Sequence, residues 1–129
     1  MKPATLKALN ASIAHWERLA KNGPSKREPI GCDSCELCWR FDPFHFDHPC
    51  ERVWRPAAQR ERGRSKVTGE RCPVFARTGE RGCSATPYDD VDALTGPLGA
   101  MRATGVTLAA WRAAARRELA FLRSLRPKP

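Results

Sequence analysis

Cysteines constrain this chain more than any other feature, because two cysteine-bearing stretches far apart in the sequence both have the character of a metal site. Residues 31–38 read GCDSCELC, and residues 72–83 read CPVFARTGERGC. Residues 1–20 interleave charged and apolar side chains, so they contain no signal-peptide core and no membrane-spanning run. We therefore expect a reducing cytoplasmic setting, in which clustered cysteines favour metal binding over disulfides.

The spacing of the cysteines predicts a single structural zinc site. Two cysteines separated by two residues can share a zinc ion, because a tight turn points both side chains the same way. Cys35 and Cys38 form such a pair, and the glycines before Cys83 allow the chain to return to a metal that Cys72 also binds. We predict that Cys35, Cys38, Cys72 and Cys83 hold one Zn²⁺.

Other assignments of the cysteines stay open. Cys32 and Cys50 are left over, and His45 and His48 are near enough in sequence to replace one of the four ligands. The alternatives are reduced buried thiols, disulfides in a secreted protein, a reactive thiol beside an arginine, and an iron–sulfur cluster. His45 and His48 with Asp42 and Asp47 also allow a metal-dependent nuclease, but the sequence offers no matching motif elsewhere. A non-enzymatic protein is therefore favoured.

The net charge of +9 favours an acidic partner, nucleic acid first and an acidic protein surface second. Residues 51–71 contain seven basic and three acidic residues, which predicts an exposed basic insertion in a single domain spanning residues 1–129. Trp54 in this insertion would stack on an unpaired base. The predicted binding residues lie in the insertion and along one edge of the last helix: Arg52, Arg55, Arg60, Arg62, Arg64, Lys66, Arg112, Arg116 and Arg123.

Apolar periodicity predicts a mainly α fold with irregular loops and little or no sheet. Residues 4–21 and 107–125 each carry apolar side chains at three- and four-residue steps, which is typical of amphipathic helices. In the first helix we expect Thr5 to be the N-cap and His15 to be a partly exposed side chain beside the stripe. In the last helix the stripe begins at Leu108. We expect both helices to pack around the four-cysteine centre.

Two shorter features complete the expected fold. Thr86 and Pro87 predict the start of a short helix that ends before residues 96–97. The alternation of Phe44 and Phe46 with polar residues suits one brief strand, whose length the neighbouring prolines limit.

An ordered set of motifs resembles a known group of proteins. These motifs are Ser12-Ile13-x-His15-Trp16, Cys35-x-x-Cys38, Cys72-Pro73-Val74, Thr78-Gly79-x-x-Gly82-Cys83, Thr86-Pro87-Tyr88 and Glu118-Leu119-x-Phe121-Leu122-x-Ser124-Leu125. Together they are similar to small cysteine-rich proteins encoded by tailed bacteriophages and prophages. The resemblance implies a phage origin and a host-cytoplasmic setting, and it favours the pair Cys35 and Cys38. The chain departs from that group by its long arginine-rich spacer and by Cys32.

The resemblance names no activity, so function is predicted from the residues. The first hypothesis is a non-enzymatic, zinc-stabilised protein that binds nucleic acid, or a host complex associated with nucleic acid, through its basic surface. The rival hypothesis is a protein-directed inhibitor that covers an acidic or DNA-binding surface of a host enzyme or defence complex.

Overall fold

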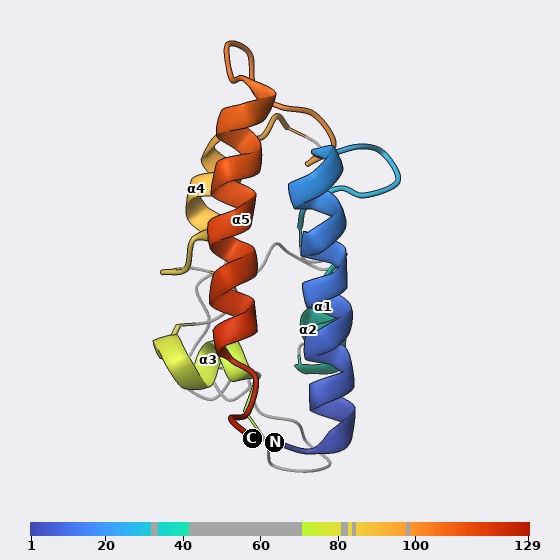
Figure 1. The fold of residues 1–129 in the computed structure, drawn as a ribbon, viewed down its shortest axis with the longest axis vertical. Coiled ribbons are helices and arrows are strands. Elements are labelled where there is room, and N and C mark those ends of the chain that lie inside the picture. The colour runs from blue at the N-terminus through green and yellow to red at the C-terminus, as the bar shows by residue number, and fades with distance from the viewer. Residues whose placement is uncertain (32–33, 42–70, 81–82, 84, 98) are drawn as a thin grey trace.

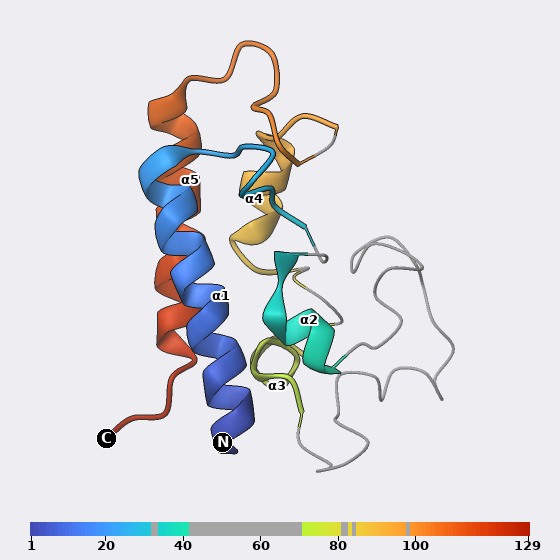
Figure 2. The same cartoon turned by 90° about the vertical axis from the view of Figure 1, so that its right-hand side faces the viewer.

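Two long antiparallel helices form the frame of the molecule in the computed structural model, which describes residues 1–31, 34–41, 71–80, 83, 85–97 and 99–129. The described residues form five helices: α1 (Pro3–Asn22), α2 (Glu36–Phe41), α3 (Pro73–Thr78), α4 (Tyr88–Ala93) and α5 (Leu108–Ser124). Helices α1 and α5 lie side by side, and the three short helices cover one side of this pair (Figure 1, Figure 2).

The described part of the chain contains almost no β-structure. An isolated antiparallel bridge between Thr95 and Arg102 closes the loop between α4 and α5, and the described residues form no sheet. The prediction of a mainly helical fold with little or no sheet is thereby confirmed. Among the described residues, no helix combines the length and the apolar character that crossing a lipid bilayer requires. The brief strand expected around Phe44 and Phe46 lies outside the described residues.

Helix α1 follows the predicted apolar stripe and ends where the sequence indicates. Leu9, Ile13 and Trp16 are buried along it, and Gly23 ends the helix with a φ of 79°, a conformation that glycine adopts without strain. The N-terminus differs from the expectation. Lys2 occupies the N-cap position and Pro3 begins the helix, so the prediction that Thr5 caps it was wrong. Thr5 is instead buried, and its hydroxyl accepts a hydrogen bond from Arg40 Nε at 2.9 Å.

Helix α5 is capped by Thr107, whose hydroxyl accepts a hydrogen bond from the backbone N–H of Ala110 at 3.1 Å. Its buried face packs against α1 and α4. Leu108 was expected to begin this apolar face, but its side chain is 40% exposed. This first helical residue lies beside Gly23, at the end of α1.

The core lies between α1 and α5 and under the short helices. Trp111 is fully buried there, and its indole N–H donates a hydrogen bond to the Thr95 hydroxyl at 2.9 Å. The same hydroxyl donates to the backbone carbonyl of Val91 in α4 at 2.6 Å. Thr95 therefore joins α4 to α5 through one side chain, and it satisfies a polar group that burial would otherwise leave unpaired.

The segment that leads from α1 to the cysteines is fixed to the loop between α4 and α5. The backbone N–H of Ile30 donates to the carbonyl of Gly99 at 2.9 Å. Gly99 has a φ of 68°, and a Cβ at this position would lie 2.5 Å from the Ile30 carbonyl oxygen. Only glycine allows this approach, so the contact sets where the chain enters the cysteine region.

The short helices follow the cysteines. Helix α2 begins immediately after Cys35, and α3 begins at Pro73, immediately after Cys72, and ends at Gly79 with a φ of 74°. Neither helix was predicted, because six residues are too few to show helical periodicity.

The third short helix, α4, is present where Thr86 and Pro87 predicted it, but Thr86 was expected to be its N-cap and Pro87 its first residue, whereas Pro87 is the N-cap and Tyr88 begins the helix. The Thr86 hydroxyl accepts a hydrogen bond from the Tyr88 N–H at 3.2 Å, which satisfies a donor at the start of the helix.

The hydroxyl of Thr95 should account for a measurable share of the free energy of unfolding. The Thr95→Val variant keeps the side-chain shape but leaves the Trp111 indole N–H without its acceptor, so we expect a loss of about 1–3 kcal/mol. Urea denaturation followed by tryptophan fluorescence measures this loss. Thr95→Ser keeps the hydroxyl and should lose less than half as much; equal losses in the two variants would contradict the assignment.

Candidate metal centre

Four cysteines from three separate segments line one cavity. Cys35 and Cys38 lie at the start of α2 and within it, Cys72 lies immediately before α3, and Cys83 lies in the turn before α4. All four are partly buried and none forms a disulfide. These are the four cysteines predicted to share a metal, so the structure brings the predicted ligand set to one place.

The cavity has a volume of about 30 Å³ and lies against the α1–α5 pair. Helix α1 contributes Ser12 and Trp16 to its wall, and α5 contributes Glu118 and Leu122. A space of this size accommodates a single water molecule or ion. In the described part of the chain, however, no three His, Cys, Asp or Glu side chains are arranged closely enough to hold a metal ion as they stand.

Hydrogen bonds between the thiols give them unequal acidities. The Cys38 thiol donates a hydrogen bond to Cys35, and this bond is the main reason that the pKa of Cys35 is lowered to about 6. Ser12 Oγ lies 3.8 Å from Cys35 Sγ and favours the thiolate further. The same hydrogen bond, together with burial, raises the pKa of Cys38 well above its ordinary value. Burial raises the pKa of Cys72 to about 11.

These acidities describe a cluster in which Cys35 is the favoured thiolate and Cys38 and Cys72 favour the protonated form. The negative charge of Cys35 opposes ionisation of Cys38 and Cys72. A divalent cation in the cavity would reverse this opposition, because a metal ion binds thiolates and displaces their protons. The arrangement is chemically suited to taking up a cation with release of protons.

Glu118 is the residue of this site that sequence reasoning missed. It lies in the middle of α5 and is 1% exposed. Its carboxyl group lies beside the Thr86 hydroxyl and the Tyr88 backbone N–H, whereas Oε2 has no hydrogen-bond partner among the described residues. Burial raises its pKa to about 8. The sequence contains a signal for this residue, because Glu118 is an acidic side chain within the apolar stripe of the last helix, next to Leu119.

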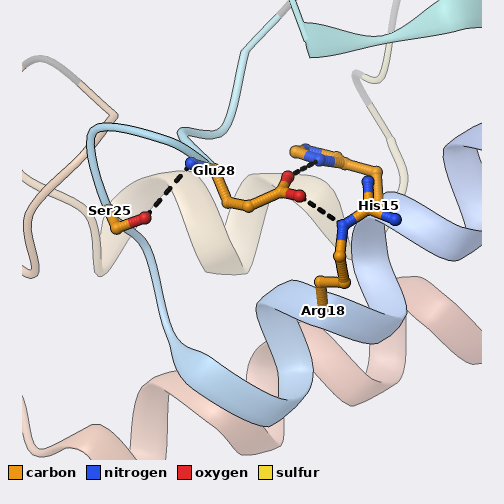
Figure 3. A network of polar contacts seen from close by, with 4 residues as sticks. All are labelled: His15, Arg18, Ser25 and Glu28. Carbon is orange, nitrogen blue, oxygen red and sulfur yellow. Dashed lines mark hydrogen bonds and ion pairs between the residues drawn. The ribbon is translucent and has the colours of Figure 1, made fainter.

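His15 lies outside the cavity and is held by a separate network (Figure 3). It was expected to be partly exposed, but it is buried and its Nδ1 is hydrogen-bonded to Glu28, which also accepts from Arg18. Burial lowers the pKa of His15 despite this partner. The backbone N–H of Glu28 donates to Ser25 Oγ at 3.1 Å, so the network fixes the turn after α1 to the helix.

The predicted row of arginines on α5 is partly used within the fold. Arg112 Nε donates to the Ala20 carbonyl at 2.8 Å, and Arg123 pairs with Glu17 at 3.2 Å. Arg116 is exposed and has no partner among the described residues. The predicted residues of the basic insertion lie outside the described residues: Arg52, Trp54, Arg55, Arg60, Arg62, Arg64 and Lys66. The alternative ligands and the candidate nuclease residues also lie outside them: Cys32, Asp42, His45, Asp47, His48 and Cys50.

Fold and cavity together define a small helical domain built around a cysteine-lined centre. No family model matches the chain, and neither the curated proteins nor the solved structures contain a match to it. The resemblance to phage-encoded proteins therefore stays a prediction.

Glu118 should make the stability of the metal-free protein depend on pH. Its pKa is about 8 in the folded protein against an ordinary value of 4.5. Between pH 4.5 and 8 the folded protein therefore keeps a proton on Glu118 that the unfolded chain has released. The contribution of Glu118 to stability is complete below pH 4.5 and is lost as the pH rises through 8. Between pH 5 and 9 we expect wild type to lose on the order of a few kcal/mol relative to Glu118→Gln.

Urea denaturation in buffer containing a chelator, repeated across this pH range, measures the difference between the two proteins. Glu36→Gln removes an exposed carboxylate next to Cys35 and should follow the wild-type curve. Parallel curves for wild type and Glu118→Gln would show that Glu118 titrates as an ordinary carboxyl group.

Proposed function

We propose that this chain is a zinc-stabilised helical domain in which Cys35, Cys38, Cys72 and Cys83 bind one structural Zn²⁺. The observation that carries the proposal is that these four thiols, from three segments, line a single cavity of about 30 Å³. Zinc in structural sites takes four thiolate or imidazole ligands in a tetrahedron. The four thiols need to come closer together to complete this geometry, and rotation about χ1 is a motion available to a cysteine side chain.

A metal at this position would explain how short elements hold their places. Helices α2 and α3 contain six residues each, and helices of this length are not stable in water without tertiary contacts. Each begins directly after a cysteine of the predicted set. One zinc ion would therefore tie the starts of both helices to the turn before α4, and it would add cross-links to a chain with a modest core.

We further propose that the domain binds nucleic acid, or a host complex associated with nucleic acid, through its basic surface. We also propose that it is encoded by a phage and acts in the cytoplasm of the host cell. The net charge of +9 supports an acidic partner. Exposed Arg116 lies on α5 between Arg112 and Arg123, and the basic residues of the 51–71 segment would add phosphate contacts. The zinc centre is structural in this proposal and carries no reaction.

Loss of a cysteine ligand should remove the metal and destabilise the fold together. Wild type purified without chelator should contain about one zinc per chain, measured by elemental analysis. Cys35→Ser and Cys83→Ser should each lower the zinc affinity by at least about 100-fold and reduce the helical signal in circular dichroism, because metal-binding free energy contributes to folding.

The matched control for these variants is Cys50→Ser, which changes a cysteine that the assignment leaves out. It should retain zinc and helicity. A folded wild-type chain without metal would end the zinc proposal, and loss of zinc in Cys50→Ser would require a different ligand set.

Binding to nucleic acid should depend steeply on salt if the basic surface contacts phosphates. We expect the logarithm of the affinity for random duplex DNA to fall linearly with the logarithm of salt concentration, with a slope of about −0.9 per phosphate contact. Fluorescence anisotropy measures this slope. Arg116→Gln should weaken binding at every sequence and make the slope less negative by about one.

Arg27→Gln is the control, because it removes the same charge from an exposed residue in the turn after α1. It should change the slope less than Arg116→Gln does. Absence of DNA binding even at low salt would contradict the nucleic-acid proposal and favour an acidic protein surface as the partner.

A further inference from the structure

The cysteine-lined cavity is also lined by a carboxylate, and one oxygen of this carboxylate has no hydrogen-bond partner among the described residues. Glu118 lines this cavity with the four cysteines, is 1% exposed, and its Oε2 has no hydrogen-bond partner among the described residues. Buried polar oxygens nearly always have a partner, and one without a partner requires an explanation such as an ion. An ion in the cavity that Glu118 lines would provide such a partner.

The rest of the Glu118 side chain is held in place. Its carboxyl group lies beside the Thr86 hydroxyl and the Tyr88 backbone N–H, and both groups favour its charged form. Thr86 in turn donates to the Cys83 carbonyl at 2.6 Å. The carboxyl group is thereby held against the turn that carries Cys83, and Oε2 is left without a hydrogen-bond partner among the described residues. Such anchoring is how proteins orient the groups that contact a metal.

We propose that Glu118 is a metal ligand of this centre, binding the ion through Oε2 beside the cysteine sulfurs. The inference rests on the proposed zinc site and changes its donor set, because Glu118 takes the place of one of the four thiolates and the ion is bound by oxygen as well as sulfur. Zinc accepts both kinds of donor, carboxylate oxygen at about 2.0–2.2 Å and thiolate sulfur at about 2.3 Å.

A carboxylate ligand is also consistent with the charge of a buried centre. A four-coordinate ion that binds Glu118 needs three of the four thiolates, and the remaining cysteine keeps its proton. Three thiolates and one carboxylate carry the same total charge as four thiolates, so the exchange leaves the net charge unchanged. Metal binding would also give Glu118 Oε2 a partner, which this buried oxygen otherwise lacks.

X-ray absorption at the zinc edge of the zinc-loaded, full-length protein distinguishes the two donor sets, because oxygen and sulfur ligands lie at different distances. We expect about one oxygen near 2.0 Å and three sulfurs near 2.3 Å in wild type. Glu118→Gln keeps the side-chain shape but removes the charge, so the zinc affinity measured by competition with a chromophoric chelator should fall about 10- to 100-fold. Glu36→Gln should stay within about twofold of wild type.

The outcomes separate this inference from the zinc proposal on which it rests. A wild-type spectrum with sulfur ligands alone overturns the role of Glu118 and leaves the zinc site standing. An oxygen shell that persists in Glu118→Gln with unchanged affinity belongs to water and also overturns it. A wild-type chain that binds no zinc overturns both. The wild-type spectrum decides the matter even if the variant does not fold.

Discussion

The packing of α1 against α5 is the interaction on which the rest of the structure depends. These are the two long helices, and each presents one wide apolar face, so burial of the two faces supplies most of the core. Polar contacts fix their register at several heights: Arg112 binds the Ala20 carbonyl near one end, and Arg126 Nε donates to Asn10 Oδ1 at 3.0 Å near the other. Ser12 and Glu118 are held at the wall of the cysteine-lined cavity because this register is set.

Contacts outside the cysteine segments decide where the cysteines arrive. The turn after α1 is held to the helix by Glu28 through His15 and Arg18 (Figure 3). The backbone N–H of Ile30 is then held by the Gly99 carbonyl. The chain reaches Cys35 a few residues later. The segment that precedes Cys35 is therefore already held in place by these contacts. This lowers the entropic cost of ordering Cys35 as a ligand.

The sequence predicted the parts of the fold that repeat a pattern and missed those that depend on a distant partner. Periodicity predicted the long helices. Cysteine spacing predicted a zinc site at Cys35, Cys38, Cys72 and Cys83; these four line one cavity, and whether they bind zinc stays a prediction. Helices α2 and α3 are too short to show a period. His15 is buried because of Glu28, thirteen residues away, and Arg112 is engaged by a carbonyl ninety-two residues away. No local pattern encodes such pairings, since they exist only once the helices have packed.

The convergence of Cys38 and Cys72 on one cavity has a consequence for how the chain can vary. These two cysteines bracket residues 42–70 in sequence, so whatever holds them together also closes the ends of that segment. The entropy of closing a loop grows only with the logarithm of its length, by about 0.6 kcal/mol for each doubling. The domain can therefore gain or lose residues between Cys38 and Cys72 at little thermodynamic cost, which makes this the place where evolution can add a new specificity to an unchanged scaffold.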